Sequence, residues 1–378
     1  MRAAVEALGR CVYLHLQEPT GYGVAARRCI DALAVHGVGV VPVAFVPEPG
    51  SGLASRPERI PSGPVDTVIA HLVPEHFPLV RQLFPDAFLI GHTVWETDRP
   101  PAHWLALLEV PDLLVVPCRW NEQTFRRAGV ATPIAVVPHV VADPPPRAEA
   151  RSSPRGDQFV FYTIADWNCR KAVWHTLRAF LRAFDQTDPV ELVIKTSPYD
   201  LTDVSPEHAG DRALGEGSTA LAVARARREI PRPPAVELIT RTLTGEEVDA
   251  LHERGDCFVS LCRSEGWGLA SFDAAAHANP IVITGFGGQL DYLDPSTALL
   301  VDHDVVAVDC PAGRPSYTPD QRWAEPDVAH GAQLLRRVVD DPAGTAERAD
   351  RLRRRVLDRY APPVIAEQFV RAVSEVRG

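Results

Sequence analysis

Short apolar runs alternate with longer helix-like runs along the chain, which is typical of a parallel α/β sheet. Strands are predicted in the first half at Cys11–Leu16, Val38–Phe45, Thr67–Ala70, Phe88–His92, Leu113–Val116 and Ile134–Val137. The helices between them are predicted at Val24–His36, His76–Phe84, Pro101–Leu108 and Asn121–Ala128.

The alternation stops at Val141–Gly156, a segment rich in Pro, Ser and Arg that we predict to be a linker. After it, strands are predicted at Phe159–Ile164, Val190–Lys195, Val236–Thr240, Cys257–Leu261 and Ile281–Thr284. Helices are predicted at Lys171–Phe184, Gly245–Arg254, Gly268–His277 and Asp327–Asp340, with a surface loop or lid at Tyr199–Gly217. The predicted fold is therefore α/β, with two doubly wound Rossmann-like domains, residues 1–145 and 156–360, facing a central cleft. Ligands of such sheets bind at the carboxyl ends of the strands.

The composition of the chain disfavours several classes of protein. The chain has 378 residues and a net charge of −10, which disfavours nucleic-acid binding and strong attraction to anionic lipid. It has no apolar run long enough for a transmembrane span, although peripheral membrane contact stays open. Glu6 and Arg10 interrupt any signal-peptide core, and the seven cysteines are scattered without a CxxC pair. A protein with reduced thiols in the cytoplasm is expected.

Two lysines, Lys171 and Lys195, stand among many arginines. This bias indicates a GC-rich genome, so a remaining lysine suggests that a compact ammonium group is needed at its site. Lys171 follows Arg170 after a predicted strand, where adjacent cations can hold a diphosphate. Lys195 ends the next strand, either as a supporting phosphate or sugar contact or as a cation paired with an acid.

The segment Ser264–Leu293 combines features that a nucleotide-sugar requires. Glu265 precedes a Gly266-Trp267-Gly268 turn and an Ala-rich helical run that carries Asp273. A helix start after a glycine turn directs backbone N–H groups at a phosphate, and the two acids can accept hydrogen bonds from sugar hydroxyls. Taken alone, Glu265 also fits an ordinary loop carboxylate.

The first half carries weaker candidates. Gly21-Tyr22-Gly23 opens a G-x-G-x-x-A pattern and is predicted to be a glycine loop, or else a simple turn before a helix. His92 and Glu96 follow a predicted strand and form a candidate acceptor-side cluster, although a lone histidine is commonly structural. Asp302 and Asp304 match D-x-D but have no His or Cys partners at ligand spacing, so no metal site is predicted.

Several of these motifs together resemble a known family. The stretch from Glu265 to Asp273 resembles the E-x7-E element of retaining GT-B glycosyltransferases, especially family 4, and Asn168–Lys171 resembles the Arg-Lys element of that family. Trp104, Pro117–Asn121 and Val137–His139 resemble its first-domain pattern. The resemblance covers nearly the whole chain and is densest from Phe159 to Val301.

The resemblance implies roles for individual residues. Arg170 and Lys171 would neutralise the donor diphosphate, and His92 would lie near the donor sugar. The residues implied to hold the remainder of the donor are Gly21, Gly23, Glu265, Gly266, Trp267, Gly268, Leu269 and Asp273. The sequence departs from the family in having Asp273 where Glu is usual and Val140 where Gly is usual. A C-terminal helix at 362–378 would return to the first domain.

The implied activity is retaining, metal-independent transfer of a sugar from a nucleoside-diphosphate-sugar, such as a UDP- or GDP-sugar, to a hydroxyl acceptor, with no further cofactor. The acceptor could be a natural product, a lipid-linked sugar or a polysaccharide, and Ile239–Arg241 is predicted to contact the donor base. Two alternatives stay open. An NAD(P)-dependent oxidoreductase would need an acid after the second strand, where Glu48 is the only candidate. A non-catalytic two-domain sugar-binding protein would have little use for adjacent Arg and Lys.

Overall fold

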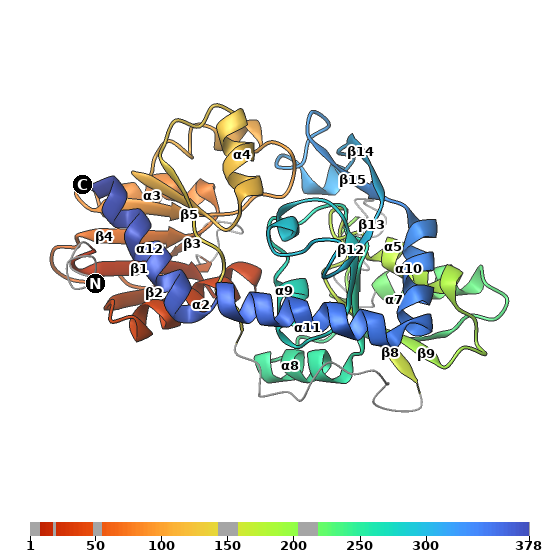
Figure 1. Cartoon of the computed structure of the whole chain (residues 1–378). Coiled ribbons are helices and arrows are strands. Elements are labelled where there is room, and N and C mark those ends of the chain that lie inside the picture. Colours follow the sequence, from red (N-terminus) through yellow and green to blue (C-terminus); the bar gives the residue numbers. More distant parts are fainter. Residues whose placement is uncertain (1–7, 18–19, 48–54, 143–157, 203–217, 378) are drawn as a thin grey trace. The chain divides into compact units, whose positions relative to one another are not determined.

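The computed structural model describes residues 8–17, 20–47, 55–142, 158–202 and 218–377 (Figure 1). The chain divides into two compact units. The first unit comprises Met1–Trp95, Arg99–Ala142 and Leu357–Gly378, and the second comprises Glu96–Asp98 and Asp143–Val356. Most of the predicted linker, and residues 203–217 of the predicted lid, lie outside the described residues.

The first unit is built on a seven-stranded sheet in the order β3-β2-β1-β4-β5-β6-β7, which is parallel except for the edge strand β3. Its strands are β1 (Cys11–Leu16), β2 (Val40–Pro47), β3 (Ser55–Pro57), β4 (Thr67–His71), β5 (Phe88–His92), β6 (Leu113–Val116) and β7 (Ile134–Val136). Its α-helices are α2 (Gly21–Val35), α3 (Phe77–Leu83), α4 (Arg119–Arg127) and α12 (Pro362–Arg377), with short 3-10 turns at Pro74–His76 and Ala102–Trp104. The C-terminal helix α12 packs against α2.

The predicted helix at Pro101–Leu108 is wrong, because only the turn Ala102–Trp104 forms there. Trp104 is 4% exposed, and its indole N–H donates to Glu75 at 2.7 Å while its ring packs edge-on against Trp95. The buried Trp104 ring and its hydrogen bond therefore hold this segment as a turn, and tertiary contacts outweigh its helical pattern.

The second unit contains a six-stranded parallel sheet in the order β10-β9-β8-β11-β12-β13. Its strands are β8 (Phe159–Ile164), β9 (Val190–Lys195), β10 (Ala235–Ile239), β11 (Cys257–Ser260), β12 (Ile281–Thr284) and β13 (Leu299–Val301). The helices that follow in the chain are α5 (Val173–Ala183), α7 (Ser218–Arg228), α8 (Gly245–Arg254), α9 (Leu269–Ala276), α10 (Val328–Asp340) and α11 (Pro342–Arg359). Phe161, Phe180 and Phe184 form an aromatic cluster in the core.

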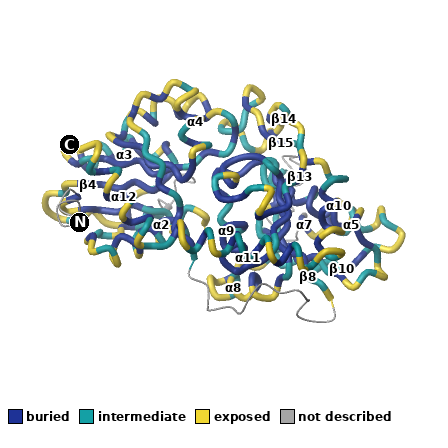
Figure 2. Tube along the Cα trace, in the orientation of Figure 1, coloured by how far each residue is buried: buried dark blue, intermediate teal, exposed yellow. Residues whose placement is uncertain are grey.

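A two-stranded antiparallel insertion, β14 (His303–Ala307) and β15 (Arg322–Pro326), was not predicted from the sequence. The strands of both large sheets are mostly buried (Figure 2), as expected for parallel sheets covered by helices. The predicted α/β class, with two doubly wound sheets, is confirmed. Among the described helices, none combines the length and apolarity needed to cross a bilayer.

Candidate functional site

In the second unit, the strand order reverses between β8 and β11, which pair directly. Crevices for ligands form at such reversal points, outside the carboxyl ends of the strands. Arg170 and Lys171 follow β8, whereas Glu265 follows β11. The topology therefore brings the two cations and the acid of the predicted donor site together.

The turn that carries Arg170 and Lys171 is closed by Asn168. The side-chain oxygen of Asn168 accepts from the Lys171 N–H at 2.9 Å, and its carbonyl accepts from the Ala172 N–H at 2.9 Å. Ala172 has φ 43°, a left-handed conformation that cannot continue a helix, so α5 begins at Val173 rather than at Lys171 as predicted. Both cations consequently lie in the turn before the helix.

Glu265 binds both cations. Its Oε2 atom lies 3.0 Å from Nη1 of Arg170, and its Oε1 atom lies 2.5 Å from Nζ of Lys171. Glu265 is only 8% exposed. Burial by itself would raise the pKa of Glu265, but the charges and hydrogen bonds of Lys171 and Arg170 outweigh burial and hold that pKa below its ordinary value. The carboxylate is therefore ionised at neutral pH.

A second carboxylate on Arg170 was not anticipated. Glu96 belongs to the second unit, where its Oε1 atom lies 3.3 Å from Nη2 of Arg170 and its Oε2 atom accepts from the Tyr317 hydroxyl at 3.0 Å. The Ser264 hydroxyl donates to the carbonyl of Glu96. His92, with which Glu96 was grouped in the sequence prediction, belongs to the first unit, so that grouping stays a prediction. No local sequence signal places Glu96 beside Arg170, since the contact joins residues far apart in the chain.

The Gly266–Gly268 turn leads into α9. Gly268 has φ +83°, and a Cβ atom there would lie 2.8 Å from Oγ of Ser271. The hydroxyls of Ser271 and Tyr292 donate to the Gly268 carbonyl at 2.8 and 3.0 Å. In the described structure no side chain caps α9, whose first N–H groups are thus suited to an anion.

Trp267 contributes to this turn through its backbone, because its ring is 2% exposed and packs against Phe272 and Tyr292. The Gly287-Gly288 turn contacts the backbone of Glu265. The Gly288 N–H donates to the Glu265 carbonyl at 2.7 Å, and a Cβ atom on Gly287 would lie 2.6 Å from the same oxygen. Glycine at 287 is therefore required for this close approach.

Three further predicted donor residues lie in the second unit, and their roles stay predictions. Asp273 is on α9 and is 8% exposed. Lys195 ends β9, and its ammonium donates to the Thr196 carbonyl at 3.0 Å, while burial lowers its pKa. Arg241, after β10, forms a 2.7 Å ion pair with Glu247.

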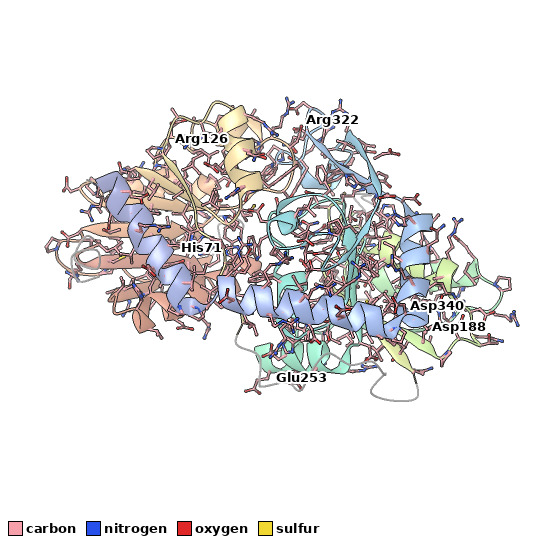
Figure 3. All side chains as sticks on the ribbon, in the orientation of Figure 1. His71, Arg126, Asp188, Glu253, Arg322 and Asp340 are labelled. Carbon is pink, nitrogen blue, oxygen red and sulfur yellow. The ribbon has the colours of Figure 1, made fainter. Side chains whose placement is uncertain are left out.

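The first unit contains a group of stacked histidines at its strand ends. His15, His71 and His92 lie in register on β1, β4 and β5. The rings of His71 (Figure 3) and His92 stack with their centroids 3.8 Å apart, and His139 lies 6.0 Å from His92. Burial and the neighbouring His139 hold the pKa of His92 well below its ordinary value.

Both ring nitrogens of His92 are buried and have no hydrogen-bond partner among the described residues. His71 was not among the residues predicted from the sequence. The sequence did contain a signal for His71, because His71 and His92 both follow apolar runs that predict strands. Neighbouring parallel strands place residues at such positions side by side. A buried polar group without a partner is uncommon, so the His92 ring is a candidate for binding a hydroxyl-bearing ligand.

The predicted glycine loop at Gly21-Tyr22-Gly23 is wrong. Helix α2 already begins at Gly21, and the hydroxyl of Thr20 accepts from the Gly23 N–H at 3.0 Å. This cap starts the helix earlier than the apolar pattern suggested. Gly21 and Gly23 thus form the first helical turn, in the first unit.

The D-x-D sequence is part of the β14 insertion. Asp302 lies 3.1 Å from Nδ1 of His330, and Asp304 is on β14. Within the described ranges, no three His, Cys, Asp or Glu side chains are grouped to hold a metal ion.

Solved structures similar to this chain share its fold. Sucrose-phosphate synthase from Thermosynechococcus elongatus matches with a TM-score of 0.67 at 16% identity, over 97% of this chain and 99% of that chain. HepE from Anabaena, in complex with UDP and glucose, matches with a TM-score of 0.63 at 13% identity over 97% and 99%. α,α-Trehalose 6-phosphate synthase from Burkholderia multivorans matches with a TM-score of 0.63 at 14% identity over 97% and 98%. These likenesses confirm the predicted GT-B fold.

No curated protein matches the sequence. A family model described as family 4 glycosyltransferase in conflict systems matches residues 121–369, about two thirds of the chain. The match spans the Arg170–Lys171 turn, Glu265 and α9, so the similarity includes the residues that meet at the strand reversal. The chain belongs to the family 4 glycosyltransferases found in conflict systems.

Proposed function

We propose that this protein transfers a sugar from a nucleoside-diphosphate-sugar to a hydroxyl group of an acceptor, with retention of configuration and without a metal ion. The observation that carries the proposal is the meeting of Arg170, Lys171 and Glu265 beside the start of α9. Cations, a helix start and an acid together match a diphosphate joined to a sugar.

The charges of the site support a donor diphosphate. Arg170 and Lys171 carry two positive charges, which Glu265 and Glu96 balance with two negative ones. A diphosphate would replace carboxylate oxygens as the partner of both cations. Glu265 would then be free to accept hydrogen bonds from the donor sugar, as the family resemblance implies.

The same residues would stabilise the leaving group. When the bond between sugar and phosphate breaks, negative charge develops on the leaving phosphate oxygen, and Arg170, Lys171 and the N–H groups of α9 would stabilise it. In the proposed reaction the acceptor hydroxyl attacks the face that the phosphate leaves, and that phosphate takes the proton. No protein nucleophile is required.

A UDP-sugar is the first donor to test, because HepE has been solved with UDP-glucose. GDP-sugars are the next. We place the acceptor on the first unit, where His92 is buried at a strand end and its two ring nitrogens have no hydrogen-bond partner among the described residues. A natural product, a lipid-linked sugar or a polysaccharide all offer such a hydroxyl.

A thermal-shift panel with UDP, GDP, dTDP, ADP and NAD, each with EDTA, tests the proposal. A ligand at about 100 times its dissociation constant stabilises the folded state by about 2.7 kcal/mol. We expect one nucleoside diphosphate to stabilise the wild-type protein and Arg170→Ala to lose that shift. Arg178→Ala, an exposed arginine on α5, is the matched control and should keep it. Stabilisation by NAD alone would instead favour an oxidoreductase.

A further inference from the structure

Arg263 joins the two loops that meet at the proposed donor site. It lies two positions before Glu265, and its backbone N–H donates to the Arg170 carbonyl at 2.8 Å. Its side chain contacts the same turn, because Nη1 donates to the Cys169 carbonyl at 3.2 Å. In the opposite direction, Nη1 of Arg170 donates to the Ser264 carbonyl at 3.1 Å. Backbone and side-chain hydrogen bonds therefore hold the two loops together.

Aromatic rings from two elements fix the direction of the Arg263 side chain. Its guanidinium carbon lies 5.5 Å from the centroid of the Trp174 ring and 5.0 Å from that of the Trp323 ring. Trp174 is on α5, and Trp323 is on β15, where it is almost fully buried. A cation over the face of an aromatic ring is attracted by the electrons of the ring, and more strongly where water is excluded. Only 17% of the Arg263 side chain is exposed, so both contacts restrict its position.

Glu325, on β15 of the insertion (Figure 1), is the acidic partner of Arg263. Its Oε2 atom accepts from Nε of Arg263 at 2.8 Å, and its Oε1 atom lies 3.0 Å from Nε2 of His175 on α5. Burial by itself would raise the pKa of Glu325, but hydrogen bonds with His175 and Arg263 lower that pKa to about 2. The carboxylate is therefore ionised at neutral pH, and the insertion supplies both a charge and an aromatic ring to Arg263.

We propose that Arg263 is a positioning residue, which holds the turn of Arg170 against the loop of Glu265. Glu325 of the β14–β15 insertion in turn holds Arg263 in place. The physical basis is the fork of the guanidinium, whose Nε and Nη1 atoms donate to Glu325 and to the Cys169 carbonyl at the same time. The effect on nucleotide binding rests on the proposed function, which assigns Arg170 to the diphosphate, whereas the placement of the turn does not.

The direction of the Arg170 guanidinium matters for a phosphate ligand. A guanidinium binds phosphate oxygens through two parallel hydrogen bonds, so its affinity depends on its orientation. Without the Arg263 side chain, the Cys169 carbonyl and the Glu325 carboxylate lose their shared partner, and the turn gains freedom. Ordering of Arg170 would then cost free energy when a diphosphate binds, and the affinity for the diphosphate would fall.

Hydrogen exchange of the full-length protein without nucleotide tests the placement of the turn. The N–H groups of Lys171 and Ala172 both donate to Asn168 within the turn, so their exchange rates measure how often the turn opens. We expect R263M to raise these rates at least about fivefold, because contacts in one network are coupled. E325Q, which keeps the shape of the acid, should raise them too and serves as the test if R263M does not fold. Unchanged rates would overturn the inference.

Arg336 provides the matched control. Its guanidinium lies 2.7 Å from Asp188 and 4.5 Å from the centroid of the Phe184 ring, so R336M also removes a positive charge, an ion pair and a contact with a ring. Phe184 and Asp188 follow the carboxyl end of α5, whereas the turn precedes its amino end. R336M should therefore keep the wild-type exchange rates in the turn. An equal increase in R336M and R263M would mean general loosening of the unit and would overturn the inference.

UDP affinity, measured by calorimetry on the same variants, tests the link to the donor. R263M and R263K should both raise the dissociation constant at least about fivefold, because lysine keeps the charge but not the fork. E325Q should weaken binding by itself but not further in R263M, since Glu325 acts through Arg263. Wild-type affinity in R263K would show that charge alone matters and would overturn the positioning role. Failure of the wild type to bind UDP would count against the proposed UDP donor, while the exchange rates would still decide the placement of the turn.

Discussion

The ammonium group of Lys171 lies 2.5 Å from the carboxylate of Glu265, although 94 positions separate the two residues in sequence. Arg170 contacts the other oxygen of the same carboxylate at 3.0 Å. One buried acid thus binds two adjacent cations in the place where we propose a diphosphate. The compact ammonium of Lys171 contacts one oxygen of the carboxylate, and the planar guanidinium of Arg170 contacts the other.

Replacement of Lys171 tests the assignment of the leaving group. We expect Lys171→Ala to lower kcat by about a hundredfold or more, because the loss of one transition-state contact of this kind raises the activation barrier by roughly 2.7–4 kcal/mol. Arg178→Ala should keep wild-type turnover. The measurement is steady-state sugar transfer, with circular dichroism to show that the fold survives. Wild-type turnover in Lys171→Ala would remove the phosphate role.

Gly287 gives a prediction about stability. Its φ of 99° and ψ of −165° lie in a region that only glycine commonly occupies, and an added Cβ atom would lie 2.6 Å from the Glu265 carbonyl oxygen. We expect Gly287→Ala to lower the free energy of unfolding by roughly 1–3 kcal/mol. Gly245→Ala is the control, since no atom lies within 4 Å of its added Cβ. Equal urea midpoints for both variants would contradict the prediction.

The histidine group predicts a pH dependence of stability. Burial lowers the pKa of His92 and His71 in the folded state, so below about pH 6.5 the unfolded chain binds more protons and the folded state loses stability. Each such histidine lowers the free energy of unfolding by up to about 1.4 kcal/mol for each pH unit below that value. We expect His92→Phe to reduce the slope of unfolding free energy against pH.

Urea unfolding between pH 7 and pH 5 measures this slope. His36→Gln, at the carboxyl end of α2, serves as the control and should keep the wild-type slope. An unchanged slope in His92→Phe would show that His92 binds a proton equally in the folded and unfolded states.

Metal removal tests the proposed electrostatics directly. We expect transfer activity to survive EDTA, because Arg170 and Lys171 supply the positive charge that a metal ion supplies in other transferases. Activity lost with EDTA and restored by Mn²⁺ would direct attention to Asp302 and Asp304, where His330 already contacts Asp302. Activity assays with and without the chelator decide the matter.

The sequence by itself determined most strands of the two large sheets, the α/β class and the residues of the proposed donor site. Strands β1, β5, β8 and β9 have the predicted bounds, because a buried parallel strand is a local apolar run with polar ends. Arg170, Lys171 and Glu265 were identifiable because each follows such a run. Parallel topology then brings strand ends together, so the convergence of these three residues follows from local pattern and general sheet geometry.

The tertiary structure alone decided which distant groups complete the site. Glu96 contacts Arg170 from a distant part of the chain, and the Tyr317 hydroxyl in turn donates to Glu96. Helix α2 begins earlier than predicted because Thr20 caps it. A turn forms at Ala102–Trp104 where a helix was predicted, because Trp104 is buried. Such contacts depend on long-range packing and on single hydrogen bonds, and neither produces a repeating pattern of apolar residues in the sequence.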